Sequence, residues 1–485
     1  MKNMRKISEK SRWFESPYFY KRSCDLLFLG FAFFFLMKYA YVWKWVEGLS
    51  LFVPDAAFFQ SFLKITAGML AYAGSFLTQF LYYPAAGCLL FIALLYGVQQ
   101  LTARVFRIPS GWYPCSFLPS FLLLTAVVNV GYTWATLKAP GHFFVPALGC
   151  CFFLLVYGGY RRIGNPYIRL LTVLFVVASY PFFGFYALFG AGLCLVYEGL
   201  EGTGKIRFLL LPIGIAAIWV VPKLYYYGLD GTEQEISRIY VAGLPPFFIR
   251  RTELMLWMPF LLLFGWYAVF ALVTETCQKD RKKFGVWERR FSLAAFFAAL
   301  LFTVSQAYEN DNFKAGVRSN LAIEEGDWEK ADEAVAQVKQ NPTRDVAINR
   351  QLACLYLGKP QSSAELPPLP VAYKDARPGI LTFMQLSGLQ MNYYGGQTNI
   401  CYRWAVELSV EFGWQVSRLK LLVKCALLNG ERDLAQKYNH RLKQTFFHKA
   451  WAEKYQQYID HPEQMKHDRE FARILVDPSP NQFVE

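Results

Sequence analysis

Residues 254–273, LMLWMPFLLLFGWYAVFALV, form a run of about twenty apolar residues without a charged side chain. An α-helix rises about 1.5 Å per residue, so a helical run of this length matches the roughly 30 Å hydrocarbon core of a bilayer. Runs of this kind recur throughout the first 308 residues of the 485-residue chain. The sequence therefore predicts an all-α, polytopic membrane protein.

Nine such runs are predicted to be membrane spans. They cover residues 24–43, 84–102, 116–136, 143–160, 167–181, 183–197, 208–227, 254–273 and 291–308. The fifth and sixth runs are short and nearly fused, so a re-entrant pair or one long bent element is the alternative to two crossings. The first run follows a basic stretch and lacks an obvious cleavage site, which favours an uncleaved anchor over a signal peptide.

Lysine and arginine are distributed unevenly between the predicted spans. If the N-terminus is cytoplasmic, the inside segments up to residue 308 hold twenty of these residues and the outside segments hold seven. Positively charged loops resist translocation, so this bias predicts a cytoplasmic N-terminus. An odd number of crossings then places the C-terminal segment on the outer side of the membrane.

Three regions follow from composition: a basic cytoplasmic N-terminus (1–23), a transmembrane domain (24–308) and a soluble helical domain (309–485). The net charge of the chain is +14, yet residues 309–485 contain 22 basic and 22 acidic residues. The whole positive excess therefore belongs to the membrane half, where it reports topology and contact with anionic lipids. This argues for the bilayer as a partner and against nucleic acid.

The C-terminal region shows helical pairs separated by small residues. The stretch GDWEKA at 326–331 resembles the inter-helix turn of a tetratricopeptide repeat, and residues 352–358 and 421–430 are spaced like further units. An ordinary helical bundle is the alternative, and the prolines between residues 360 and 378 interrupt the pattern. An oxidising outer compartment would permit one disulfide among Cys354, Cys401 and Cys425, which the sequence leaves open.

No cofactor or metal signature is complete. The segment Gly199 to Lys205 matches most of a phosphate-binding loop, but Ile206 stands where a hydroxyl should hold magnesium, and no strand precedes the glycines. The five histidines and ten cysteines form no ligand spacing. The sequence therefore predicts neither a cofactor nor a metal.

Ionisable residues gather instead in the predicted outer segments. The first outer segment carries Glu47 and Asp55 and continues into an amphipathic stretch, 54–83, predicted to lie along the membrane surface. The segment after the seventh span carries four more candidates: Asp230, Arg238, Arg250 and Arg251. A carboxylate can activate a hydroxyl and arginines can clamp a diphosphate. Asp55, with Glu47, is the predicted catalytic base, and the later four are predicted substrate ligands; the alternative is that each is merely solvated.

This arrangement resembles the multi-pass glycosyltransferases of the GT-C class, in which a long first outer loop bears an acidic residue and surface helices. The resemblance implies transfer of a sugar from a polyprenyl carrier at the outer face. The segment FLTQFLYYP at 76–84 also resembles an uncharacterised family of bacterial integral membrane proteins. This resemblance implies the inner (plasma) membrane of a bacterium as the location, and it implies no activity.

Two other functions stay open. A non-enzymatic envelope assembly protein would bind protein partners through residues 309–485, because repeat-like helices build a concave surface. A transporter would need ionisable groups deep in its spans, and the span interiors offer Asn129 and little else. Broken helices around a central cavity would favour transport.

Overall fold

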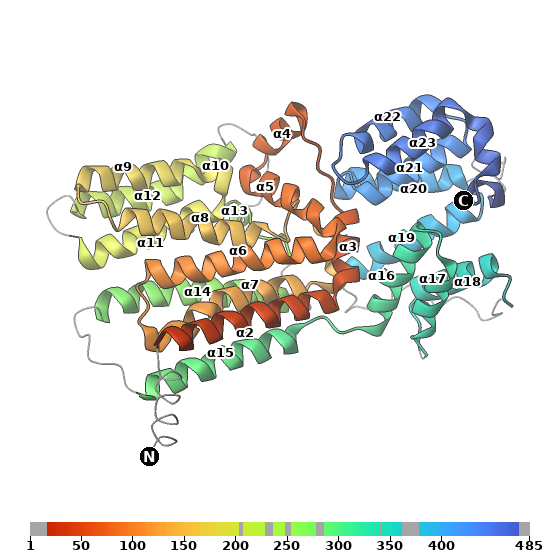
Figure 1. Cartoon of the computed structure of the whole chain (residues 1–485). Coiled ribbons are helices and arrows are strands. Elements are labelled where there is room, and N and C mark those ends of the chain that lie inside the picture. The colour runs from red at the N-terminus through yellow and green to blue at the C-terminus, as the bar shows by residue number, and fades with distance from the viewer. Residues whose placement is uncertain are drawn as a thin grey trace, which may run out of the picture.

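The structure of the protein is a computed structural model that describes residues 17–202, 207–227, 236–247, 254–277, 286–339, 341–360 and 378–474. Within these ranges every regular element is a helix, which confirms the all-α prediction. Figure 1 shows the long helices of the first 306 residues running side by side as a bundle, with the later helices gathered at one end. We call these two parts the bundle and the tail (residues 311–474).

The bundle contains long helices joined by short helical segments. The long helices are α2 (Pro17–Lys38), α6 (Pro84–Val105), α7 (Leu118–Val128), α8 (Val145–Tyr160), α9 (Pro166–Ala178), α11 (Phe185–Glu201), α12 (Arg207–Tyr225), α14 (Leu254–Cys277) and α15 (Val286–Gln306). The shorter segments are α3 (Ala40–Gly48), α4 (Ala56–Leu63), α5 (Gly68–Thr78), η1 (Gln79–Tyr82), η2 (Ser110–Phe117), η3 (Gly131–Ala135), α10 (Tyr180–Phe183) and α13 (Ile236–Ile239).

Local sequence signals set where several helices begin. Proline stands in the first turn of α6, α8 and α9, where its missing N–H costs nothing and its fixed φ suits a helix. Asn165 and Asp55 cap α9 and α4, since their side chains accept hydrogen bonds from the N–H groups of Tyr167 and Phe58. These starts were readable from the sequence alone.

Among the described residues, four to six stretches are long and apolar enough to cross a membrane, and the nine predicted crossings stay a prediction. By length and composition, four described stretches could each cross a bilayer: α6, the joined η2 and α7, α12 and α14. Two bent pairs raise this to six: α2 with α3, bent by 67°, and α15 with the first tail helix, bent by 69°. The three other predicted spans correspond to α8, α9 and α11, which have 16, 13 and 17 residues, or about 24, 20 and 26 Å of helix against a core of about 30 Å.

Contacts at the two ends of the bundle agree with the predicted alternation of the chain. At the end predicted to be cytoplasmic, the Tyr20 hydroxyl lies 3.3 Å from Ser292 Oγ. At the opposite end, the Thr66 and Tyr226 hydroxyls are 2.6 Å apart. Segments predicted to share a side therefore meet in space, while the side itself stays a prediction.

The tail consists of helices arranged as consecutive antiparallel neighbours. They are α16 (Asp311–Glu324), α17 (Trp328–Ala336), α18 (Arg344–Leu357), α19 (Pro378–Tyr394), α20 (Thr398–Phe412), α21 (Val416–Leu428), α22 (Arg432–Lys443) and α23 (Lys449–Asp460), followed by η6 (Pro462–His467) and η7 (Phe471–Arg473). Gly326, Gly396 and Gly430 adopt positive φ at the turns α16–α17, α19–α20 and α21–α22. The predicted helix pairs are confirmed; their kinship with tetratricopeptide repeats stays a prediction.

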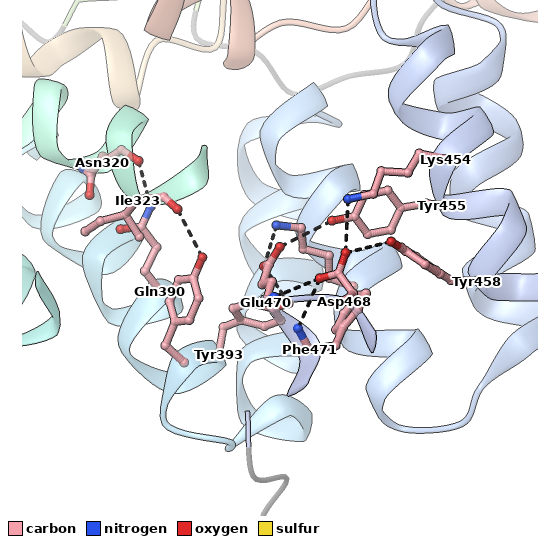
Figure 2. Close-up of polar contacts among 12 residues, drawn as sticks. Asn320, Ile323, Gln390, Tyr393, Lys454, Tyr455, Tyr458, Asp468, Glu470 and Phe471 are labelled. Carbon is pink, nitrogen blue, oxygen red and sulfur yellow. Dashed lines mark hydrogen bonds and ion pairs between the residues drawn. The ribbon is translucent and has the colours of Figure 1, made fainter. Parts of the chain in front are cut away.

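The C-terminal segment of the tail is held by a polar cluster (Figure 2). Glu470 accepts hydrogen bonds from Lys424 at 2.7 Å and from Tyr393 at 2.9 Å. Asp468 accepts one from the Tyr458 hydroxyl at 2.7 Å and pairs with Lys454 at 3.2 Å. These contacts fasten residues 468–474 onto α19, α21 and α23.

The tail and the bundle share one apolar core. Phe313 of α16 and Phe383 of α19 are both buried and pack edge-on against Trp45 of α3 and Tyr132 of η3. Burial of aromatic side chains dominates the energetics of such contacts. The tail is therefore docked on the bundle through its own helices and not only through the chain connection at residue 310.

Both bent helix pairs meet at Glu309. Its carboxylate accepts hydrogen bonds from Lys38 at 2.6 Å and from Tyr39 at the α2–α3 break, and it pairs with Lys314 of α16. Burial works against ionisation of Glu309, but the hydrogen bonds from Lys314 and Lys38 outweigh it and lower the pKa of this carboxyl to about 2. The two bends are thus joined by one ionised carboxylate.

Cys354, Cys401 and Cys425, the candidates for a disulfide, are free thiols in the structure. Cys401 and Cys425 lie on the facing helices α20 and α21, and burial raises the pKa of the Cys425 thiol well above its usual range. Buried thiols of this kind behave as small apolar residues.

Candidate functional site

Glu47, a predicted catalytic residue, lies at the junction between bundle and tail. It is buried in α3, and its Oε1 is 2.8 Å from Nε2 of His448, which is also buried and precedes α23. The Tyr82 ring stacks on Phe447 and meets the His448 ring edge-on. The structure therefore gives Glu47 a partner from the tail, and its catalytic role stays a prediction.

We expect His448→Ala to destabilise the docked tail by about 3 kcal/mol, because the buried Glu47 carboxylate would lose its partner without gaining water. The matched control is Lys449→Ala, one residue along, whose side chain is 65% exposed. A surface change of that kind costs within about 0.5 kcal/mol. Unfolding of the full chain in one detergent measures both; equal stability of the two variants would show that the Glu47 contact contributes nothing.

Asp55, the leading base candidate, also faces the tail. Its Oδ1 accepts a hydrogen bond from the Phe58 N–H at 2.6 Å and so caps α4. Its Oδ2 pairs with Arg441 of α22 at 2.8 Å, and the Asp55 side chain is 27% exposed. Asp55 is thus held in one orientation by backbone on one side and by the tail on the other, with part of the carboxylate still open to solvent.

A cavity of about 2050 Å³ lies beside Asp55, where the bundle meets the tail. This is larger than the roughly 300–1,000 Å³ of pockets that hold drug-sized ligands. Five parts of the chain line it, namely residues 46–78, residues 134–145 from η3 to the start of α8, residues 226–247, the start of α14, and residues 411–441 of the tail. Asp55 is not itself among the described lining residues, but its neighbours Val53, Ala57 and Phe58 are.

Small residues let the cavity walls approach one another closely. Gly141, with φ +68°, sits against α5, and a Cβ placed on it would lie 2.3 Å from the Ser75 nitrogen. Gly184, at the start of α11, has φ +56°, and its Cβ would lie 2.3 Å from the Ala242 carbonyl oxygen. The Phe185 N–H donates to that same oxygen at 2.8 Å. These backbone contacts fix the segments that carry the cavity lining.

Cations outnumber carboxylates among the described residues that line the cavity. Its described lining contains four cations, Lys138, Arg238, Lys437 and Arg441, and one carboxylate, Glu411. Glu411 and Lys138 are 4.0 Å apart, and Asp55 balances Arg441. A cavity edged by an excess of cations attracts anionic ligands.

The sequence had predicted one of these four cations. Arg238 is exposed and lines the cavity, and its role as a substrate ligand stays a prediction. Asp230, Arg250 and Arg251 lie outside the described residues, although Phe247 and Leu254 on either side of the two arginines line the cavity. Lys138, Lys437 and Arg441 were missed, and nothing in the sequence indicates that α22 turns toward residues 46–78.

The sequence also did not indicate that two carboxylates are buried inside the bundle. Asp25 of α2 accepts hydrogen bonds from Tyr113 at 2.7 Å and Tyr96 at 3.3 Å. Glu198 of α11 pairs with Arg169 at 3.1 Å. Both lie toward the end predicted to be cytoplasmic, away from the cavity.

The described residues contain no group of three or more histidine, cysteine, aspartate or glutamate side chains placed to hold a metal ion. What this part of the chain does offer is the cavity, with an apolar lining, a cationic edge and two nearby carboxylates, Asp55 and Glu411.

Comparison of the chain with curated proteins and with solved structures finds no match. A protein-family model does match, over residues 19–477, which is nearly the whole chain. This confirms the predicted resemblance to an uncharacterised family. The chain belongs to DUF6057, a family of unknown function.

Proposed function

We propose that this protein is a glycosyltransferase, or a relative of one, that binds a polyprenyl-linked sugar in the cavity between bundle and tail. The observation that carries this proposal is the combination, in one cavity of about 2050 Å³, of an apolar wall and a cationic edge. The prenyl chain of a lipid carrier needs an apolar wall, and its diphosphate needs a cationic edge.

The apolar wall supports entry of a ligand from a lipid bilayer. Ile65, Leu254 and Leu261 all line the cavity and are 41%, 54% and 64% exposed. An exposed apolar patch on the wall of a cavity favours contact with lipid or with an apolar ligand. A prenyl chain could therefore pass between α4–α5 and α14 without crossing water.

The cationic edge supports binding of the diphosphate. Arg238, Lys437 and Arg441 approach from α13 and α22, so the head group would be held between the bundle and the tail. Arginine suits phosphate oxygens because its planar fork donates two parallel hydrogen bonds. Arg250 and Arg251 are proposed to add to this set.

The reaction needs one base. An acceptor hydroxyl attacks the anomeric carbon, a new C–O bond forms, the bond to the phosphate oxygen breaks, and polyprenyl diphosphate leaves. The hydroxyl proton passes to a carboxylate, and we propose that this carboxylate is Asp55. Glu411, which lines the cavity, is the alternative.

The topology proposed with this function keeps the N-terminus in the cytoplasm of a bacterium and the cavity outside the plasma membrane. Helices α8, α9 and α11 lie within the bundle beside the longer helices (Figure 1). If α8, α9 and α11 also cross the membrane, the chain crosses it nine times, and an odd number of crossings places the tail outside.

Binding of a polyprenyl diphosphate to the purified full chain tests the proposal. We expect Lys437→Glu to weaken binding about fivefold, because reversing an exposed charge near a phosphate costs about 1 kcal/mol. Lys466→Glu makes the same charge change on η6, away from the cavity lining, and should leave affinity unchanged. Equal loss in both variants, or no binding by the wild-type chain, would overturn the proposed site.

A further inference from the structure

Six aromatic side chains from the bundle and the tail form one patch at the end of the bundle where α6 begins. We call it the aromatic patch, and its members are Phe76, Phe80, Tyr82, Tyr83, Phe446 and Phe447. The first four precede α6 in the chain, and the last two stand in the loop between α22 and α23. Residues far apart in the sequence therefore build one continuous surface.

Phe447 joins the two halves of the aromatic patch. Its ring stacks on that of Tyr82, with the centroids 5.5 Å apart, and meets the Tyr83 ring edge-on at 5.7 Å. The ring of its neighbour Phe446 lies 6.3 Å from that of Phe76. Phe447 is half-buried by these contacts and so holds the loop in place, whereas Phe446 stays exposed.

The patch presents large apolar groups to its surroundings. Tyr83, Phe446 and Phe76 are 59%, 56% and 37% exposed. Single exposed apolar side chains are common on protein surfaces, but a contiguous group of them marks contact with a membrane, a ligand or another protein. The aromatic patch therefore needs an occupant.

The position of the patch favours lipid as this occupant. Tyr83 directly precedes α6, which is long and apolar enough to cross a membrane, and Leu89 and Leu90 of α6 are exposed. Aromatic rings are enriched where a span leaves the hydrocarbon core, because they are apolar in the body and tolerate the wet headgroup layer. The ring contacts continue this surface from Tyr83 to Phe446 of the tail.

The charges near the patch agree with a lipid surface. Residues 76–90 contain no charged side chain, and residues 439–450 contain three lysines or arginines and no carboxylate. Among these cations, Lys449 is 65% exposed and lies 3.8 Å from Glu453 of its own helix. Anionic lipid headgroups attract cations placed in this way.

We propose that the aromatic patch lies in the interfacial layer of the bilayer that α6 crosses, with Phe446 inserted among the lipid headgroups. The tail is then attached to the membrane beside its contact with the bundle, because His448, next to Phe447, lies 2.8 Å from Glu47. This inference goes beyond the proposed function and does not depend on it. It requires only that α6 crosses a membrane.

Spin labelling of the full-length protein in nanodiscs tests this placement. A nitroxide on Phe446→Cys is compared with one on Leu355→Cys, because Leu355 is 55% exposed on α18, at the end of the tail away from the bundle (Figure 1). The measurement is the ratio of the collision rates with oxygen, which concentrates in lipid, and with a water-soluble nickel chelate. We expect this ratio to be several-fold higher at position 446 than at position 355.

Three controls accompany the comparison. The wild-type protein, treated with the same label, measures the signal from native cysteines. Tyr83→Cys reports the start of α6 and should give a ratio as high as that of Phe446→Cys. Lys449→Cys changes an exposed side chain beside the loop, so it reports the same surface if the Phe446 variant fails to fold. Its ratio should also exceed that at Leu355.

Each other outcome overturns the inference. A ratio at position 446 equal to that at position 355, together with a high ratio at position 83, would show that the tail stands clear of the membrane. Low collision rates with both reagents at position 446 would show that protein covers the patch. A high ratio at position 355 as well, or a low one at position 83, would show that the aromatic patch is not where this protein meets the lipid interface.

Discussion

Asp55→Asn is expected to lower the rate of glycan formation about a hundredfold, the lower end of what a general base contributes. Asparagine keeps an oxygen for the Phe58 N–H and so preserves the cap of α4. The asparagine amide cannot take up the proton of the attacking hydroxyl at neutral pH. The measurement is the initial rate of glycan accumulation in a strain that depends on this protein, after induction of each variant to equal abundance.

The matched control for Asp55 is Arg441→Gln, which breaks the same 2.8 Å ion pair from the other side and leaves the carboxylate in place. We expect it to weaken lipid binding but to lower the rate at saturating lipid only a few-fold, because an exposed pair contributes about 1 kcal/mol or less. If the two variants lose the same amount, Asp55 acts only by docking the tail. If Asp55→Asn keeps its activity, Glu411 becomes the base to test.

Gly141→Ala is expected to destabilise the protein by about 4 kcal/mol. The left-handed conformation of Gly141, φ +68°, costs about 1–2 kcal/mol for a residue with a Cβ. The Cβ would also lie 2.3 Å from the Ser75 nitrogen and 2.4 Å from the Gly74 carbonyl carbon. Backbone atoms cannot rotate away, so this overpacking adds about 1–3 kcal/mol.

Gly97→Ala is the control for Gly141→Ala. Gly97 lies in α6, and a Cβ there meets nothing within 4 Å. Alanine in a helix interior is favoured over glycine by about 1 kcal/mol, so this variant should be at least as stable as the wild type. Thermal unfolding of both variants in one detergent checks the pair. A Gly141→Ala protein that unfolds at the wild-type temperature would show that α5 and residue 141 are not packed as described.

The position of the tail changes how the enzyme and the assembly protein can be told apart. From the sequence alone, a chain cut after about Asp311 is expected to retain lipid-substrate binding if it is an enzyme and to lose its function if it is a scaffold. The tail, however, supplies Glu411, Lys437 and Arg441 to the cavity lining. Such a truncation removes part of the proposed substrate site, so point variants are the better test of either function.

Transport gains only part of the support it would need. The two helix pairs bent by 67° and 69° are breaks of the kind expected in transporters. The cavity, however, lies where the bundle meets the tail and not at the centre of the bundle. The buried carboxylates Asp25 and Glu198 are paired with tyrosine and arginine partners far from it along the helices.

The helical class, the starts of many helices and the change of composition near residue 310 could all be read from the sequence, because they depend on local patterns. The number of crossings is not fixed in this way, because hydropathy marks apolar stretches but not the length of the helix that forms within each. Residues 143–160 and 167–181 are apolar throughout much of their length, yet α8 and α9 stop at 16 and 13 residues.

The sequence also predicted a site in the acidic segment that carries Glu47 and Asp55, and Asp55 does lie beside the cavity. It could not show that Asp55 meets Arg441 or that Glu47 meets His448, because 386 and 401 residues separate the partners. No periodicity or motif records a contact over such a separation.

By itself, then, the sequence determined the class of the chain, because the burial of apolar side chains and the preferences of proline, asparagine and glycine act over a few neighbouring residues. Only the tertiary structure shows that the tail packs against the segment that carries Glu47 and Asp55, and that Arg238, Lys437 and His142 border one cavity. Such convergence depends on how whole helices pack, which is a property of the assembled molecule.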